Sequence, residues 1–301
     1  MYRDFLGLNS DPFSLTPDSE FFFSDRIRQE ALNTLLYGVR SGEGFIKVVG
    51  EVGTGKTTLC RQFLRAIADE AETAYILDPL LRGDELLRTV ARELGLDPEG
   101  QDQQELLAAV RAFMLETWEK GRPVVLLVDE AQALPLETLE QLRLLSNLET
   151  EKAKLLRIVL VGQPELNVRL REPSIRQLRQ RIVYSYTLGP LSRKDLGSYL
   201  QYRMRIAGHQ GGLVFRPGAV RVLYRGSGGV LRLVNILAHK ALLAAYGEGQ
   251  PQVRRRHVKA AVRDTEAAKG VALLARFSPA LMAAQSAAAS TGLAPFATGM
   301  L

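Results

Sequence analysis

A glycine-rich segment between an apolar run and a helical pattern constrains this chain more than any other feature. Residues 50–57 read GEVGTGKT and follow the apolar run FIKVVG at 45–50. The spacing is G-x-x-x-x-G-K-[ST], in which glycine lets the backbone curl closely around a phosphate. The helix N-terminus that follows favours an anion at the same place. The segment therefore predicts a P-loop, and a strand-to-helix turn that merely needs glycine is the weaker interpretation.

This loop predicts a site for the phosphates of ATP and for Mg²⁺. We expect the Lys56 ammonium to bridge the β- and γ-phosphates and the Thr57 hydroxyl to hold Mg²⁺. The other predicted nucleotide-binding residues of the loop lie on either side of these two. They are Gly50, Glu51, Val52, Gly53, Thr54, Gly55 and Thr58.

The composition is that of a soluble globular protein. Of the 301 residues, 46% are hydrophobic and 24% are charged, and no apolar run is long enough to span a bilayer. The first residues lack the basic-then-apolar order of a signal peptide. A single cysteine, Cys60, fits a reducing compartment and a small buried position. We therefore expect a cytoplasmic protein.

Strand-like and helical patterns alternate through the first two thirds of the chain. After FIKVVG come TAYILD (73–78), PVVLLVDE (123–130) and LLRIVLVGQ (155–163), with helical patterns around 83–94 and 103–119. Strands that alternate with helices imply a parallel sheet covered by helices on both faces. The predicted fold class is α/β, with a P-loop NTPase core and a C-terminal all-helical lid.

Four segments are expected along the chain. Residues 1–40 would form an N-terminal arm and a helix, and residues 41–187 the P-loop ATPase core. From residue 188 the apolar spacing becomes helical, which predicts a helical lid over 188–268 whose last helix lies in 253–266. Residues 269–301 are rich in Ala, Ser and Gly and read as a low-complexity, disordered tail.

Positive charge is concentrated in the predicted lid. Residues 188–268 hold 14 Lys/Arg and 4 Asp/Glu, whereas the whole chain has a net charge of +6. Such a lid could meet a polyanion such as DNA. It could instead meet the acidic body of a neighbouring subunit, and we favour this second interpretation.

Acidic and polar residues follow two of the predicted strands. Asp129 and Glu130 end PVVLLVDE, and Gln163 follows LLRIVLVG. The carboxyl ends of parallel strands meet at one edge of a sheet, where ligands bind. Asp129 would complete the Mg²⁺ shell and Glu130 would deprotonate the attacking water. Gln163 would contact the γ-phosphate or the water, unless it is a simple turn residue.

Arginines that follow these strands are candidates for contacts with the phosphates. Arg176, Arg179 and Arg181 lie in SIRQLRQRIVYSYTL, and a forked guanidinium suits the charge of a phosphoryl transition state. We expect Arg181, or next Arg179, to act on a neighbouring subunit's nucleotide, whereas Arg176 fits a solvated basic face. Arg232 begins a lid helix after a glycine turn and could reach the γ-phosphate.

The order of these motifs resembles an AAA+ ATPase. The segments below are further similar to the general secretion pathway protein A family, most of all to its ATPases of mannose-sensitive haemagglutinin pilus biogenesis. They are DFLGL (4–8), PFSLTPD (12–18), EAL (30–32), YGV (37–39), GEGFIKVVGEVGTGKTTLCR (42–61), DEAQALP (129–135), LRLLSNLET (142–150), KLLRIVLVGQPEL (154–166), RQLRQRI (176–182) and RDTE (263–266). One departure is Leu231, which stands where the family's lid motif usually has proline.

The resemblance implies an oligomeric ATPase that serves an envelope machine: a type IV pilus, a secretin of type II secretion, or surface polysaccharide export. Its partners would be further copies of itself and a membrane-associated component, which would recruit it to the inner membrane. The alternative is a DNA-binding AAA+ ATPase of the transposition-regulator type, motivated by the basic lid.

Overall fold

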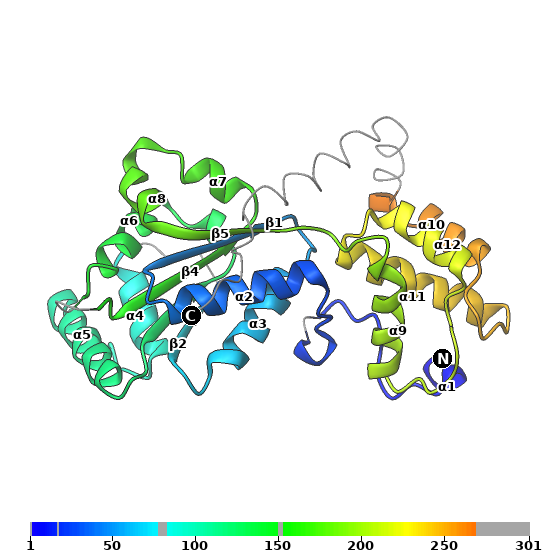
Figure 1. The fold of residues 1–301 in the computed structure, drawn as a ribbon, viewed down its shortest axis with the longest axis horizontal. Helices are drawn as coiled ribbons and strands as arrows, with labels where there is room; N and C mark the ends of the chain where they lie inside the picture. Colours follow the sequence, from blue (N-terminus) through cyan, green and yellow to red (C-terminus); the bar gives the residue numbers. More distant parts are fainter. Residues whose placement is uncertain (1, 17, 78–82, 150–152, 269–301) are drawn as a thin grey trace, which may run out of the picture. The chain divides into compact units, whose positions relative to one another are not determined.

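The described residues form two units (Figure 1), each with its own hydrophobic core. The structure is a computed structural model that describes residues 2–16, 18–77, 83–149 and 153–268. The sheet unit spans Arg26–Leu188, and the helical unit combines residues 2–25 with 189–268. The expected N-terminal segment of residues 1–40 is thus divided after Asp25 between the two units. The expected tail, 269–301, lies outside the described residues.

Five parallel strands build the sheet unit, in the order β2-β3-β4-β1-β5. Alternation along β1 explains the burial on both faces: Phe45 and Val49 belong to one core cluster, and Ile46 and Val48 are buried on the opposite face. The expected strands are found within about two residues of their predicted ends. The strands are β1 (Phe45–Gly50), β2 (Glu72–Ile76), β3 (Val124–Val128), β4 (Leu156–Gly162) and β5 (Ile182–Leu188).

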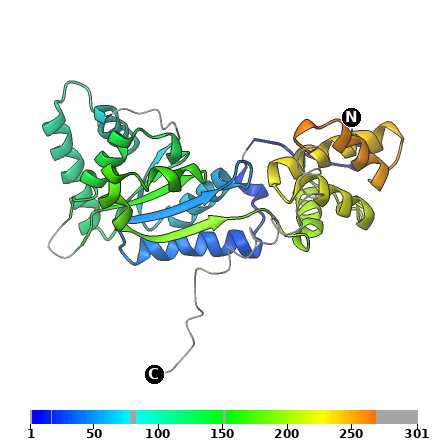
Figure 2. The same ribbon diagram turned by 90° about the horizontal axis from the view of Figure 1, so that it is seen from above.

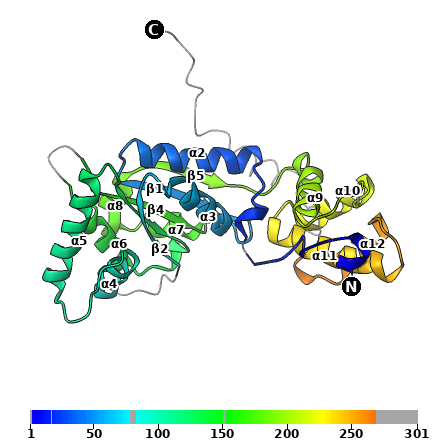
Figure 3. The same ribbon diagram turned by 90° about the horizontal axis from the view of Figure 1, so that it is seen from below.

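Helices cover both faces of this sheet, as the alternating pattern predicts (Figures 2 and 3). Helix α2 lies so close to the sheet that a Cβ at Gly38 would lie 2.6 Å from Ile46 Cδ1. The opposite face packs against apolar residues of α4, α5 and α6. The helices of this unit are α2 (Arg26–Arg40), α3 (Lys56–Ile67), α4 (Gly83–Glu93), α5 (Gln103–Glu119), α6 (Leu136–Leu145), α7 (Glu165–Arg169) and α8 (Arg176–Arg181), with short 3₁₀ turns η2 (Ala131–Ala133) and η3 (Pro173–Ile175).

The helical unit is organised around α11, whose apolar residues are buried on several sides. Its core also includes residues from the start of the chain, such as Tyr2 and Phe13. None of the described helices combines the length and apolar content needed to cross a bilayer. The elements are α1 (Tyr2–Leu6), η1 (Ser19–Phe21), α9 (Asp195–Ile206), α10 (Pro217–Ser227), α11 (Leu231–Gly247) and α12 (Arg255–Arg263).

A buried arginine ties the first residues of the chain to α9. The Arg203 guanidinium donates to the Pro12 carbonyl and stacks over the Phe21 ring, 4.3 Å from its centroid. Tyr202 donates to the Glu20 carbonyl at 3.0 Å. These contacts explain why residues 2–25 belong to the helical unit.

Candidate nucleotide site

The predicted site residues of the sheet unit gather at the carboxyl ends of three neighbouring strands. The P-loop follows β1, Asp129 and Glu130 follow β3, and Gln163 follows β4. Strand β4 lies between β1 and β3 in the sheet, so the three loops share one edge. This is the edge at which open parallel sheets bind ligands.

Glycine is required in the P-loop for two different reasons. Gly53, with φ 79°, and Gly55, which caps α3 with φ 96°, have a left-handed conformation that side chains disfavour. At Gly50, a Cβ would lie 2.8 Å from the Leu188 carbonyl oxygen, so the requirement there is space. Gly55 offers no side-chain cap to α3, which leaves the first N–H groups of the helix available to an anion.

Lys56 is buried at the start of α3. Its ammonium donates to the carbonyl of Gly50 at 2.9 Å and to that of Glu51 at 3.3 Å. The charge is therefore held inside the curve of the loop by two carbonyls. A phosphate bound in the loop would take the place of these two neutral carbonyls as the partner of Lys56. Because the phosphate is charged, its hydrogen bond to the ammonium would be stronger.

Thr57 and Asp129 form the predicted metal-binding pair. The Thr57 hydroxyl donates to Asp129 Oδ2 at 2.9 Å, and Asp129 is almost fully buried. The Tyr75 hydroxyl, from β2, approaches the same oxygen at 3.4 Å. Burial, together with the nearby Cys60 and Asp129, raises the pKa of Tyr75, so this side chain stays a neutral donor. The arrangement presents oxygen atoms at the start of α3, beside the P-loop.

Glu130 occupies a strained position and is held by two amides. Among the described residues it is the one non-glycine residue with positive φ, at 49°. Gln163 Nε2 donates to Glu130 Oε2 at 3.0 Å, and Gln132 Nε2 donates to the same oxygen at 2.6 Å. Burial would raise the pKa of Glu130, but these two hydrogen bonds and the charge of Lys56 outweigh it and lower the pKa. Glu130 is therefore ionised at neutral pH.

The predicted arginines differ in their surroundings. Arg181 donates to Ser146 Oγ at 2.6 Å and to the Arg143 carbonyl at 3.3 Å, so it binds the end of α6. Arg179 and Arg176 are exposed on α8. Arg232 is exposed on the first turn of α11, in the helical unit. Leu231 occupies the first position of that helix, where proline is readily accommodated.

Three residues at this site were not predicted from the sequence. Gln132 lies two positions after Glu130, and Tyr75 comes from β2. Arg28, on α2, is buried and donates to the Thr54 carbonyl of the P-loop at 2.8 Å. Tyr75 lies in a predicted strand and Gln132 follows one, so both could have been proposed from their places near strand ends. Nothing in the sequence near Arg28 indicates that it reaches the P-loop.

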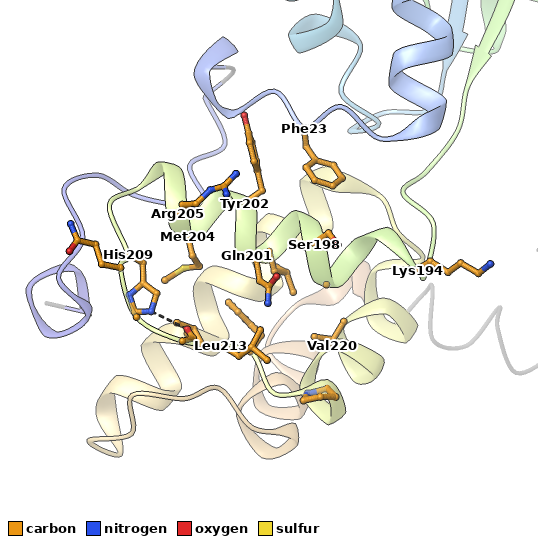
Figure 4. Close-up of a pocket in the computed structure, with 18 of the residues that line it drawn as sticks. Phe23, Lys194, Ser198, Gln201, Tyr202, Met204, Arg205, His209, Leu213 and Val220 are labelled. Carbon is orange, nitrogen blue, oxygen red and sulfur yellow. Dashed lines mark hydrogen bonds between the residues drawn. The ribbon is translucent and has the colours of Figure 1, made fainter.

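A separate hollow lies in the helical unit, between α9 and the segment that leads into α10 (Figure 4). Met204, Phe215 and Val220 supply apolar walls, and Lys194 and Arg205 are among its charged residues. None of the described lining residues is acidic. The hollow lacks the pair of carboxylates and the glycine loop found at the sheet edge, so the sheet edge is the candidate nucleotide site.

Strand order, P-loop and strand-end carboxylates together define a P-loop NTPase fold, and the predicted fold class is confirmed. Residues 39–170 match the model of a family described as "AAA domain", a range that includes the P-loop, Asp129, Glu130 and Gln163. The chain is 43% identical to general secretion pathway protein A of Aeromonas hydrophila over 254 residues, which are 84% of this chain and 46% of that protein. The chain thus spans about half the length of this curated relative.

Solved structures share the fold at low identity. Cdc6p of Pyrobaculum aerophilum aligns with a TM-score of 0.66 and 20% identity over 85% of this chain and 71% of that one. The ORC2 protein of Aeropyrum pernix, solved in ADPNP–ADP complexes, aligns with a TM-score of 0.63 and 19% identity over 85% of this chain and 71% of that one. The ORC1 protein of Aeropyrum pernix, solved in complex with DNA, aligns with a TM-score of 0.59 and 18% identity over 84% of this chain and 69% of that one. These likenesses show the fold.

Proposed function

We propose that this chain binds and hydrolyses ATP with Mg²⁺ as an AAA+ ATPase. One observation carries the proposal: the Thr57 hydroxyl, the Asp129 carboxylate and the amide-held Glu130 lie at one sheet edge beside the buried Lys56. The match to an AAA domain and the relative in a secretion pathway support it. Phosphate release from ATP by the purified chain, measured with and without Mg²⁺, tests it directly.

The residues fit a nucleotide and its metal ion. The glycine loop leaves backbone N–H groups and the Lys56 ammonium to hold phosphate oxygens. Thr57 and Asp129 provide two hard oxygen ligands, and Mg²⁺ commonly takes its remaining ligands from phosphates and water. Bound Mg²⁺ supplies charge stabilisation to the phosphates.

The chain's own side chains would supply the rest of the chemistry. Glu130 Oε2 accepts both amide hydrogen bonds, so its other oxygen can accept a proton from the attacking water. Gln163 donates to Glu130 at 3.0 Å and would also contact the γ-phosphate or this water. Arg232, from the helical unit, would contact the terminal phosphate and make the placement of that unit depend on the bound nucleotide.

We further propose an oligomeric role in an envelope machine, of a type IV pilus, of type II secretion or of surface polysaccharide export. The name of the Aeromonas relative supports a secretion pathway, and the resemblance to mannose-sensitive haemagglutinin pilus ATPases supports a pilus. Shared ATP sites between copies would couple assembly to hydrolysis. A membrane-associated pilus or secretion component would recruit the chain from the cytoplasm to the inner membrane.

A neighbouring subunit should supply an arginine to each ATP site. Because Arg181 is bound to Ser146 whereas Arg179 is exposed, the contacts now favour Arg179 for this role. We expect Arg179→Ala to lower kcat about 10³-fold, in the range of other arginine fingers. Mixing the Arg179→Ala and Glu130→Gln proteins should restore part of the activity. Where an Arg179→Ala subunit binds the nucleotide and a Glu130→Gln subunit lies beside it, the shared site has both an intact Glu130 and an intact Arg179. Arg176→Ala, on the same helix, is the control, and failure of the mixture to recover any activity would contradict sharing.

DNA binding remains the second candidate function, favoured by a basic surface on α10 and α12. The two helices pack together, since a Cβ at Gly218 would meet the Arg255 side chain and one at Gly226 would meet Val262. Five exposed cations on these helices lie at spacings of four: Arg221 and Arg225 on α10, and Arg255, Lys259 and Arg263 on α12. Arg256 on α12 is also exposed, and it pairs with Glu248.

This surface predicts salt-sensitive binding to duplex DNA in the presence of ATP. Replacing Arg255 and Lys259 by alanine should reduce the slope of log affinity against log salt by about one per lost contact. Replacing Arg193 and Lys194, exposed elsewhere in the same unit, is the control. A gel-shift titration without any salt-sensitive binding would exclude this candidate function.

A further inference from the structure

Gln132 links the candidate base to the neighbouring strand. It lies in η2, two positions after Glu130, and uses both ends of its amide. Nε2 donates to Glu130 Oε2 at 2.6 Å, while Oε1 accepts from the Gln163 backbone N–H at 2.8 Å. One side chain therefore joins the carboxylate that follows β3 to the backbone that follows β4.

The end of β4 leaves room for this amide. A Cβ on Gly162 would lie 2.8 Å from Gln132 Oε1 and 3.3 Å from Gln132 N. Gly162 does not have a positive φ, so its conformation does not call for glycine. The requirement for glycine at this position is space, and the space is filled by Gln132 and, at 3.2 Å, by Leu166 Cδ2.

The backbone at Gln132 is also held in place, by a hydrogen bond from α7. Arg169, from α7, donates to the Gln132 carbonyl at 2.6 Å. This contact fixes the turn that begins at the strained Glu130. Strain of this kind persists only where surrounding contacts hold it, and it is common at active sites.

The two amide donors leave the carboxylate asymmetric. Gln132 and Gln163 both donate to Oε2, and within the described residues no hydrogen bond to Glu130 Oε1 is found. A carboxylate anchored by one oxygen presents the other in a fixed direction. This is what a base needs if it is to meet a water in line with a phosphate.

We propose that Gln132 is a positioning residue that anchors Glu130 through Oε2 and aims Oε1 at the attacking water. The inference rests on the proposed function, in which Glu130 is the base, and it deepens that function. Gln132 would act through Glu130, to which it donates, and not on the nucleotide directly. Its contribution is to hold the direction of the Glu130 carboxylate.

The first test needs no nucleotide. Gln132→Met keeps the length of the side chain without its amide donor, and its crystal structure is compared with that of the wild-type chain. Without the hydrogen bond from Gln132 Nε2, the Glu130 carboxylate should turn from its wild-type direction, while the turn at Ala131–Ala133 and the contact from Arg169 persist. A carboxylate that keeps its wild-type direction in Gln132→Met would contradict the proposal.

The second test is kinetic. Gln132→Met should lower kcat for ATP hydrolysis about 10- to 100-fold, with KM and nucleotide affinity within about twofold of wild type. Gln104→Met, an exposed glutamine on α5, is the matched control.

Gly162→Ala provides an independent variant that leaves both partners unchanged. Its Cβ would displace the Gln132 amide, so kcat should fall as in Gln132→Met. In a protein that already carries Gln132→Ala, Gly162→Ala should lower kcat little further, because the Gln132 amide that its Cβ would displace is absent. Gly197→Ala, on α9 with open space around its Cβ position, controls for the change of residue type.

The outcomes separate this inference from the proposed function. If wild type hydrolyses ATP and Glu130→Gln does not, but Gln132→Met keeps the wild-type kcat, the positioning role is wrong and the ATPase assignment stands. If folded wild type neither binds nor hydrolyses ATP, both are overturned. Additive effects of Gly162→Ala and Gln132→Ala would also contradict the proposal.

Discussion

Replacing Lys56 by alanine is expected to abolish ATP binding. The ammonium is buried in the P-loop, where it makes hydrogen bonds to two carbonyls, and it would face the phosphates with no water between. Removing one partner of a buried, hydrogen-bonded charge pair costs about 2–5 kcal/mol. This corresponds to an affinity at least about 30-fold weaker. A fluorescent ATP analogue, titrated in the presence of Mg²⁺, measures the change.

Lys47→Ala is the control for this substitution. Lys47 lies on β1 in the same unit, and its ammonium donates to Asn167 rather than into the P-loop. It should therefore bind nucleotide as wild type does. The thermal unfolding midpoint of each variant should be measured to show that the protein is folded. Wild-type affinity in a folded Lys56→Ala variant would show that the phosphates bind elsewhere.

Glu130→Gln is expected to keep ATP but to hydrolyse it slowly. Glutamine has nearly the same shape as glutamate, and its side-chain oxygen can still accept hydrogen bonds from the neighbouring amides. The strained turn should therefore be preserved. It cannot take a proton from water, and loss of a general base typically costs 10²- to 10⁴-fold in rate. We therefore expect kcat to fall by about that factor, with nucleotide affinity within a few-fold of wild type. Phosphate release and nucleotide titration measure the two quantities.

The same variant should form larger assemblies with ATP, because the nucleotide that joins subunits would persist. Light scattering after gel filtration, with ATP and Mg²⁺ in the buffer, measures their mass. Glu137→Gln, which changes an exposed carboxylate at the start of α6, should behave as wild type. Normal turnover by Glu130→Gln would refute the role of Glu130 as the base.

The sheet could be predicted because its strands are locally distinct in sequence. VVLLV in β3 is buried at every position, and a short apolar run of this kind, followed at once by two acids, is typical of a central parallel strand. The P-loop is equally local, since its glycines and Lys56 are contiguous. For the same reason Asp129 and Gln163 could be placed near the loop: parallel strands bring their carboxyl ends to one edge.

Contacts between distant segments could not be predicted in this way. Residues 2–25 read as an arm, and nothing in them shows that Pro12 and Phe21 meet the buried Arg203. Arg28 reaches the P-loop from α2 because the tertiary packing brings Thr54 to it. Arg181 is the first candidate for the shared arginine from the sequence, whereas its hydrogen bond to Ser146 depends on where α6 ends.

The central claim is that this sheet edge holds ATP and cleaves its terminal phosphate. A single-turnover experiment tests it most directly: radiolabelled ATP and Mg²⁺ are mixed with an excess of folded wild-type protein, and bound ATP, ADP and phosphate are separated over time. We predict that the protein retains the label and converts it to ADP and phosphate, faster per chain at higher protein concentration. Folded protein that retains no nucleotide and releases no phosphate at any concentration would contradict the account.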